Sequence, residues 1–349
     1  MSSVDLSCPL PVSGYDQIVL GHGSGGRLSD ELLRSVFLPA FTNQALARLE
    51  DQATLELPGG ERIAVSTDGY VVRPIFFPGG NIGKLAVHGT VNDLVVGGAR
   101  PLYLTAAFVL EEGLPLSELR QIVESMRAAC AESGIALVTG DTKVVDRGKG
   151  DKVFITTTGI GIVPKERSLS IHGARAGDSV LVSGTMGDHG VAILSVREGL
   201  EFETPLESDT AALGGLVQVL LRACPSVRAM RDPTRGGLAS TLNEIATASG
   251  VGIAVDERAV PVRDEVRAAC EMLGLDPLYV ANEGKLVAIV PASEEEPALA
   301  ALRSHPLGTR ANVVGRVVES PVGKVTVRSR SGGTRLLPML AGEQLPRIC

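Results

Sequence analysis

The run VFITTTGIGIV at residues 153–163 decides the fold. It is rich in β-branched side chains, which pack well on a pleated sheet, so it predicts a β-strand. Upstream, IALVT at residues 135–139 predicts another strand, and residues 116–132 have the apolar spacing of a helix that Gly134 ends. Residues 102–111 read as a strand that leads into that helix. Strands that alternate with helices predict an α/β fold built from layers.

The same alternation continues over the rest of the chain, with one break. At 349 residues the chain is too long for one ordinary core, so we expect two domains. The polar stretch from Pro164 to Gly177 separates residues 1–165 from residues 175–337 and leaves 338–349 as a tail. The other expected elements are strands at 17–20, 62–72, 179–183, 251–255, 285–290 and 309–318, with which the order closes, and helices at 27–38, 82–96, from near Asp188, and at about 209–222, 236–248 and 263–273.

Composition excludes several classes of partner. The formal net charge is −7 and no run of Lys or Arg occurs, which argues against nucleic acid. No uncharged apolar stretch approaches the ~18 residues that a membrane-spanning helix needs. The first residues have neither a basic nor an apolar segment of the kind found in secretory signals, so we expect a cytoplasmic protein that does not contact the membrane.

The chain ends in a cysteine, Cys349. Pro338 and Pro346 discourage helix formation, so the tail is expected to be extended and flexible, with a reach of at most ~40 Å. A thiol on such an arm could visit two separate sites, although chain termini are often disordered and inert. The other cysteines are widely spaced and fit neither a disulfide framework nor a zinc site, and Cys130 and Cys270 lie in helical patterns typical of buried positions.

Four aspartates follow apolar runs and are flanked by small residues: Asp68, Asp93, Asp141 and Asp232. Carboxylates are hard oxygen ligands of the kind that Mg²⁺ uses when it also binds phosphates. Turns favour Asp in any case, so each one alone is weak evidence. The glycine-rich segment at residues 21–27 could present amide groups to phosphate, or it could be a flexible turn, because it lacks the ending of a Walker A loop.

Five segments, taken together and in order, resemble the HypE family of nickel–iron hydrogenase maturation proteins. That family belongs to the superfamily of aminoimidazole ribonucleotide (AIR) synthetase, or PurM, and selenophosphate synthetase. The terminal PRIC is the most discriminating segment, whereas DPTRGG marks the wider superfamily. The segments are FFPGGNIGK at 76–84, HGTVNDL at 88–94, TGDTKVV at 139–145, RDPTRGGL at 231–238 and PRIC at 346–349.

The resemblance implies a two-domain PurM-like α/β fold, a homodimer in which the N-terminal domains pair through their sheets, and an ATP-dependent carbamoyl dehydratase. In this family a partner, HypF, transfers a carbamoyl group to the terminal thiol. ATP with Mg²⁺ then drives dehydration of the S-carboxamide to a thiocyanate, and cyanide passes to iron held by a HypC–HypD complex. An amide oxygen leaves readily only after phosphorylation, while a base removes the N–H protons.

The resemblance also implies roles for particular residues. Cys349 would carry the substrate, Lys143 would stabilise phosphoryl charge and Glu283 would be the base, although an exposed Lys and a turn Glu are usually just solvated. Arg347 would partly offset the terminal carboxylate, whose charge raises the pKa of the thiol. Mg²⁺ and nucleotide would be bound by Asp68, Asp93, Asp141 and Asp232, with Lys84, Asn92, Gly140 and Thr142 beside them.

Other readings remain open at this point. Selenophosphate synthetase needs a nucleophilic cysteine or selenocysteine and a lysine in the N-terminal glycine-rich loop, and neither is present in residues 21–27. AIR synthetase and thiamine-phosphate kinase have no use for a terminal cysteine. A non-catalytic adaptor that docks a partner through its tail belongs to a different class, and ATP turnover by the isolated protein would distinguish it.

Overall fold

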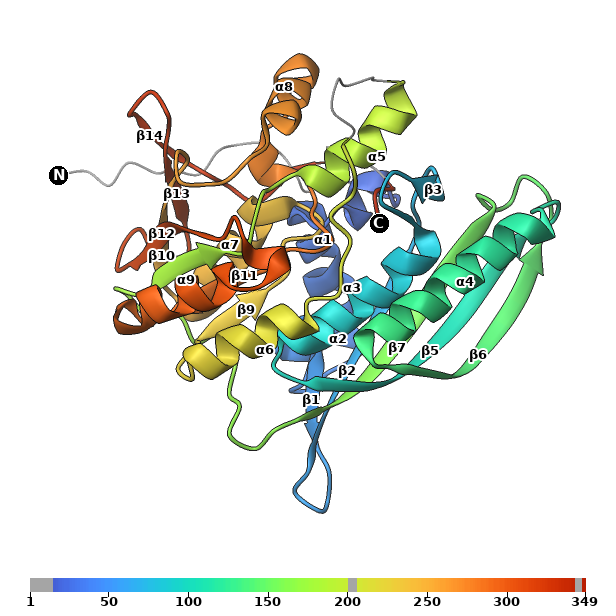
Figure 1. Ribbon diagram of the computed structural model, residues 1–349, viewed down its shortest axis with the longest axis horizontal. Coiled ribbons are helices and arrows are strands. Elements are labelled where there is room, and N and C mark those ends of the chain that lie inside the picture. Colours follow the sequence, from blue (N-terminus) through green and yellow to red (C-terminus); the bar gives the residue numbers. More distant parts are fainter. Residues whose placement is uncertain (1–14, 200–205, 343–346) are drawn as a thin grey trace.

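The computed structural model describes residues 15–199, 206–342 and 347–349. The residues before and after the segment 164–178 form two large β-sheets, and helices pack against each sheet (Figure 1). No helix in these three ranges has the length and apolar character needed to cross a membrane. The site described below lies where the two sheets and their helices meet.

The first sheet has five strands in the order β1-β2-β7-β5-β6. Only the β5–β6 pair is parallel, and α4 connects these two strands. The helices α3 and α4 lie against this sheet (Figure 1). The bounds are β1 Ala53–Glu56, β2 Arg62–Tyr70, β5 Arg100–Glu111, β6 Ala136–Val145, β7 Val153–Val163, α3 Ile82–Val96 and α4 Leu116–Ser133; the short hairpin before α3 is β3 Phe76–Phe77 and β4 Gly80–Asn81.

Local sequence explains where the two helices of this layer begin and end. The side chain of Asn81 accepts hydrogen bonds from the N–H groups of Gly83 and Lys84, which caps the start of α3. Gly134 ends α4 in the left-handed conformation, with φ of 65°, which glycine adopts without a steric penalty. Nearly every residue of α3 is buried, because the sheet packs on one side of it and the second half of the chain on the other.

The second sheet has seven strands in the order β14-β13-β10-β12-β8-β11-β9, and only β10 and β13 pair in parallel. Its strands are β8 Ser179–Val182, β9 Ala229–Arg231, β10 Gly252–Asp256, β11 Val287–Val290, β12 Asn312–Val318, β13 Val325–Arg328 and β14 Thr334–Leu336. Its main helices are α5 Asp188–Glu198, α6 Gly214–Ala223, α7 Gly237–Ser249, α8 Asp264–Leu273 and α9 Glu295–Arg303. The N-terminal segment adds η1 Leu20–Gly23, α1 Arg27–Leu32, η2 Leu33–Phe37, α2 Leu38–Ala40 and η3 Leu46–Arg48.

One hydrophobic core joins the two halves. It contains Leu85 and Val91 of α3, Leu216 and Leu220 of α6, and Ile348 from the end of the chain. Burial of apolar side chains at this junction contributes roughly 25 cal/mol per Å² of area removed from water. The two layers are therefore held together at the place where the site lies.

Most of the expected elements are confirmed, and the helix at 82–96 and the strand at 153–163 have the expected bounds. The strand expected at 17–20 is wrong, because its apolar side chains are exposed and it pairs with no strand of the described chain. The helix expected from 209 starts only at Gly214. The strand order does not close at 318, and sequence reasoning missed β1, β9, β13, β14 and α9.

Candidate active site

Four aspartates from separate elements form an acid cluster: Asp51, Asp68, Asp93 and Asp232. Carboxylate oxygens of Asp51, Asp93 and Asp232 lie within 4.8 Å of one another. Asp51 precedes β1, Asp93 lies in the last turn of α3 and Asp232 directly follows β9. Asp68 of β2 lies close enough for its charge to raise the pKa of Asp93 and Asp232, and its Oδ2 accepts a hydrogen bond of 3.2 Å from Thr90 Oγ1.

The acid cluster is electrostatically strained. Burial raises the pKa of Asp93 well above its ordinary value, and the charges of Asp68, Asp232 and Asp51 raise it further. Burial and the charge of Asp51 do the same to the pKa of Asp232. Converging carboxylates that cannot all ionise together bind a divalent cation readily, because its charge removes their repulsion. The donor set therefore fits Mg²⁺.

Neighbouring side chains orient the cluster. The Arg231 guanidinium lies 2.6 Å from Asp51 Oδ1, and it lowers the pKa of Asp51 against the larger effect of burial. The Ser66 hydroxyl donates a hydrogen bond of 2.6 Å to Asp93 Oδ2. Sequence reasoning missed Asp51, because it precedes a short strand instead of following an apolar run.

A tight turn at residues 232–237 delivers Asp232. Gly236 and Gly237 have φ of 75° and 58°, in the left-handed region that favours glycine. A Cβ on Gly237 would lie 2.7 Å from the carbonyl oxygen of Val280, so the turn packs against the segment that leads to Glu283. The DPTRGG segment thus has a geometric function: it places Asp232 in the cluster and Arg235 near the end of the chain.

Glu283 lies beside the acid cluster and is only 3% exposed. Burial raises its pKa well above the ordinary value, Asp232 and Asp209 raise it further, and Arg235 opposes them. Its backbone N–H donates a 3.0 Å hydrogen bond to Asp209 Oδ1. Glu283 Oε1 is buried without a hydrogen-bond partner among the described residues. A carboxylate whose pKa is raised is a stronger base than an exposed one, and Oε1 is free of competing hydrogen bonds among the described residues, so Glu283 suits the role of a general base.

The end of the chain is docked at this site, in contrast to the flexible arm that the sequence predicts. The N–H of Val71 donates a 2.9 Å hydrogen bond to the terminal carboxylate of Cys349, and the N–H of Arg73 donates one of 3.1 Å to the Arg347 carbonyl. Ile348 is 4% exposed. The physical reason is that β2 ends before Val71, which leaves backbone donors free, while Ile348 gains from burial in the shared core.

The start of the tail is also anchored. Asn243 Nδ2 donates to the Leu337 carbonyl at 2.8 Å, and the Tyr279 hydroxyl donates to the Pro338 carbonyl at 2.8 Å. The N–H of Arg27 donates to the Leu340 carbonyl at 2.8 Å, so the glycine-rich segment holds the tail. Pro346 lies outside the described residues.

The thiol of Cys349 packs against the shared core and lies close enough to the acid cluster to feel its charges. Burial raises its pKa to about 12, and the charges of Glu283, Asp68 and Asp232 also raise it, whereas Arg235 lowers it. Arg347 pairs instead with Asp151. The cation that opposes the negative charges around the thiol is therefore Arg235, and not Arg347 as the sequence suggested.

The predicted residues of β6 lie elsewhere in the single chain. Gly140, Asp141, Thr142 and Lys143 are exposed on this edge strand, with Lys143 Nζ 2.8 Å from Asp141 Oδ2. In the sheet β6 is three positions from β2, which carries Asp68, and this corresponds to roughly 14 Å at the usual strand spacing. One chain therefore does not bring these four residues to the acid cluster.

Lys84 and Asn92 hold the structure around the site. Lys84 lies in the first turn of α3, at the opposite end of this helix from Asp93, and its Nζ donates a 3.1 Å hydrogen bond to the Gly79 carbonyl. Asn92 uses its whole amide: Nδ2 lies 3.0 Å from the Ala211 carbonyl and 3.4 Å from the Glu283 carbonyl, and Oδ1 accepts from the N–H of Leu213 at 2.9 Å. Asn92 thereby supports the backbone of Glu283.

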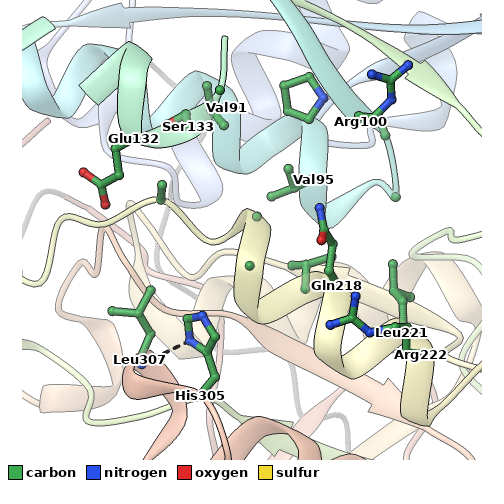
Figure 2. A pocket seen from close by; sticks show the side chains of 18 of the residues that line it. Val91, Val95, Arg100, Glu132, Ser133, Gln218, Leu221, Arg222, His305 and Leu307 are labelled. Carbon is green, nitrogen blue, oxygen red and sulfur yellow. Dashed lines mark hydrogen bonds between the residues drawn. The ribbon is translucent and has the colours of Figure 1, made fainter. Parts of the chain in front are cut away.

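Two cavities differ in their relation to the site. One, of about 680 Å³, is lined by Gly25, Asp51, Ser66 and Arg231, and thus opens directly onto the acid cluster. The other, of about 800 Å³, lies between α3, the end of α4 and α6, where Val95, Glu132, Gln218 and His305 line it (Figure 2). The residues predicted to bind nucleotide or metal line neither cavity, but Asp51 of the acid cluster lines the smaller one and no member of the cluster lines the larger one. The smaller cavity is the better candidate for a nucleotide.

Known proteins share the sequence and fold of this chain. Residues 49–163 match the family model for the N-terminal domain of AIR synthase related proteins, and residues 175–328 match that for the C-terminal domain. The chain is 57% identical over 333 residues to the carbamoyl dehydratase HypE of Cupriavidus necator, with 95% of each chain covered.

Solved structures agree with the sequence comparisons. A crystal structure of HypE in complex with ATP has a TM-score of 0.80 and 52% identity, covering 95% of this chain and 100% of that one. HypE in a complex with HypF has a TM-score of 0.84 and 47% identity, covering 88% of this chain and 99% of that one. The chain therefore belongs to the AIR synthase related family and, within it, to the HypE carbamoyl dehydratases.

Proposed function

We propose that this chain dehydrates an S-carboxamide on its own Cys349 to a thiocyanate, with ATP as the phosphoryl donor, in hydrogenase maturation. The observation that carries the proposal is the docked terminus, which presents the Cys349 thiol to Glu283 and the acid cluster. A non-catalytic adaptor would not need its terminal thiol among buried carboxyl groups. The full-length similarity to HypE proteins supports the same conclusion.

The reaction balances as two steps. Transfer of the γ-phosphoryl group to the amide oxygen gives ADP and an S-bound O-phosphorylated imidate, with loss of one N–H proton. Cleavage of the C–O bond then releases phosphate, and loss of the second N–H proton leaves S–C≡N. Glu283 is the group at the docked terminus suited to accept such a proton, because its Oε1 has no competing hydrogen bond among the described residues.

We assign the metal site to the acid cluster. Asp51, Asp68, Asp93 and Asp232 would hold Mg²⁺, which supplies charge neutralisation for the triphosphate. The 680 Å³ cavity next to Asp51 is the proposed place of the nucleotide. Its wall includes Gly25 and Gly26, whose lack of side chains lets Arg235 and Leu340 of the same chain pack against them.

Mass spectrometry of the C-terminal peptide tests the function. HypF, the partner in the solved complex of a similar protein, is incubated with this chain, carbamoyl phosphate and Mg-ATP. We expect Cys349 first to gain a carbamoyl group and then to lose one water from it. Modification of Cys130, Cys224 or Cys270 in place of Cys349 would contradict the proposal.

We further propose a homodimer built on the edge strand β6. Leu137, Val138 and Val144 are exposed there, and no strand of the described residues pairs with the outer edge of β6. An unpaired edge of this kind is a template for a second chain. In the dimer, we infer, Asp141 and Lys143 complete the site of the partner subunit. The cyanide group of the thiocyanate would then pass to a HypC–HypD complex. A cytoplasmic location remains a prediction.

Mixed dimers test whether Lys143 acts in the partner's site. A Lys143→Ala chain keeps Cys349, and a Cys349→Ser chain keeps Lys143, so each is inactive alone. If Lys143 acts across the dimer, mixing the two after dissociation restores up to about a quarter of wild-type thiocyanate formation, because half of the dimers then hold one complete site of two. No recovery in a mixture shown to contain heterodimers would contradict action across the interface.

A further inference from the structure

His189 lies between the end of the chain and the core. It is fully buried in the first turn of α5. Its Nε2 is 2.8 Å from the Ile348 carbonyl oxygen and its Nδ1 is 2.7 Å from Ser208 Oγ. The ring of Phe77 meets the imidazole edge to face, with centroids 5.7 Å apart and an interplanar angle of 90°. The imidazole is thus held on three sides.

The hydrogen bonds determine which nitrogen carries the proton. The Ile348 carbonyl can only accept, so Nε2 must donate to it. Nδ1 of the neutral ring is then an acceptor, and the Ser208 hydroxyl donates to it while accepting from the N–H of Thr210 at 3.2 Å. Burial lowers the pKa of His189, in agreement with a neutral ring.

The carbonyl that His189 contacts is one residue before the substrate-bearing thiol. On the other side of the tail, the N–H of Val71 donates to the terminal carboxylate of Cys349 and the N–H of Arg73 donates to the carbonyl of Arg347. Arg197 Nη2 also donates to the Arg347 carbonyl, at 2.9 Å. The segment between β2 and β3 of the first layer and α5 of the second thus hold the same three residues from two sides.

We propose that His189, oriented by Ser208, is the latch that holds the C-terminal tail in its docked position and so sets the place of the Cys349 thiol. It is a positioning residue: its imidazole contacts the Ile348 carbonyl and acts on the thiol only through the tail. The role of the latch in catalysis rests on the proposed function, but the docking itself does not.

Alkylation of Cys349 measures docking without ATP or HypF. The full chain is treated with iodoacetamide, and the rate at which the C-terminal peptide gains mass is followed. A lost hydrogen bond shifts the equilibrium towards the undocked tail by roughly threefold to tenfold. We expect His189→Ala to speed alkylation by that factor and Ser208→Ala to speed it less. His189→Gln, whose amide can donate to Ile348, should restore a rate near that of the wild type.

The matched control is His88→Ala. His88 is also fully buried but lies on α3, where its Nε2 is 3.5 Å from Glu132 Oε2 and its ring interacts with the backbone of Thr210; no hydrogen bond or ion pair among the described residues joins it to the tail. Unchanged alkylation in His88→Ala together with faster alkylation in His189→Ala supports the latch. An unchanged rate in both His189→Ala and Ser208→Ala overturns it, as do equal increases in His88→Ala and His189→Ala or a failure of His189→Gln to restore docking.

A truncated chain separates the latch from general destabilisation. In a chain that lacks residues 347–349, His189→Ala should lower the midpoint of thermal unfolding less than it does in the full chain, because the Ile348 carbonyl is already gone. An equal loss in both backgrounds overturns the latch. If His189→Ala does not fold in the full chain, alkylation of Ser208→Ala decides. If the alkylation results support the latch but the chain forms no thiocyanate, only the proposed function is contradicted.

Discussion

At the scale of single residues, the acid cluster lowers the stability of the apoprotein but supplies the proposed metal site. Buried carboxyl groups of like charge cost free energy in the apoprotein, and the structure keeps Asp51, Asp93 and Asp232 together. A bound cation would remove this repulsion, in line with the proposed metal site. The Ser66 hydrogen bond lowers the pKa of Asp93, but burial and the neighbouring carboxylates raise it by more.

Asp93→Asn should therefore stabilise the apoprotein while it weakens nucleotide use. The folded-state pKa of Asp93 is raised, so its ionisation opposes folding at neutral pH, and this penalty disappears below the ordinary Asp value of 3.8. We expect a higher unfolding midpoint than wild type at pH 7 without Mg²⁺, no difference near pH 3, and at least a tenfold loss of ATP turnover.

Asp141→Asn is the matched control for apoprotein stability. The carboxyl group of Asp141 is exposed and pairs with Lys143, and its pKa is lowered first by the hydrogen bond from that lysine. Its removal should not raise the unfolding midpoint at pH 7. A rise equal to that of Asp93→Asn would show that the gain does not come from relief of the acid cluster.

At the scale of elements, two short connections position the acidic residues Asp232 and Glu283 of the candidate site. The turn at residues 232–237 delivers Asp232 from β9, and the segment after η4 (Pro277–Tyr279) delivers Glu283. They touch at Gly237, where backbone of Tyr279 and Val280 leaves no room for a side chain. Asn282 locks the contact, because its Nδ2 donates a 2.9 Å hydrogen bond to the Pro233 carbonyl. The positions of Asp232 and Glu283 are therefore coupled.

Gly237→Ala should damage both stability and the site, and Gly250→Ala supplies the comparison. Both glycines flank or begin α7 with positive φ, at 58° and 66°, but a Cβ on Gly250 meets nothing within 4 Å. Each variant should lose about 1–2 kcal/mol of unfolding free energy from left-handed strain. Gly237→Ala should lose more, because of the contact at 2.7 Å with Val280, and should also bind Mn²⁺ more weakly.

Urea unfolding and Mn²⁺ titration would check this pair of variants. Equal losses of stability, with Mn²⁺ affinity unchanged in both, would mean that the close contact at Gly237 does not position Asp232.

At the scale of the whole molecule, the end of the chain joins the two layers. Ile348 packs in the core that contains residues from both halves, and residues 347–349 bind backbone groups after β2 and side chains of α5. The docked thiol is protonated at neutral pH, since burial raises its pKa to about 12. Docking therefore lowers the reactivity of the thiol and also places the thiol near the acid cluster.

Ile348→Ala should lower the unfolding free energy, whereas Cys349→Ser should not. Full burial of an Ile side chain is worth roughly 1.5–3 kcal/mol, and most of that is lost on truncation. Cys349→Ser keeps Ile348 and the backbone contacts, so it should fold and bind ATP normally but form no thiocyanate, because a serine hydroxyl is a poor nucleophile at neutral pH. Chemical denaturation and the peptide mass assay measure the two effects; equal stability in the two variants would show that the tail contributes nothing to the core.

The sequence by itself determined the elements with strong local signals and the identity of the chemistry. The helix at 82–96 has an Asn cap and the strand at 153–163 a β-branched run, and both signals act between near neighbours in the chain. The order of motifs, ending in PRIC, was enough to predict the family, the fold and ATP-dependent dehydration.

Only the tertiary structure decided which residues meet. Asp51 joins the acid cluster although no local pattern marks it, and Arg235 rather than Arg347 faces the thiol. The tail docks because free N–H groups after β2 and the imidazole of His189 lie where its carbonyls can reach them. The tail contacts join segments more than a hundred residues apart, and the acid cluster joins Asp51 to Asp232, so their energy depends on the folded positions of both partners and local sequence does not encode it.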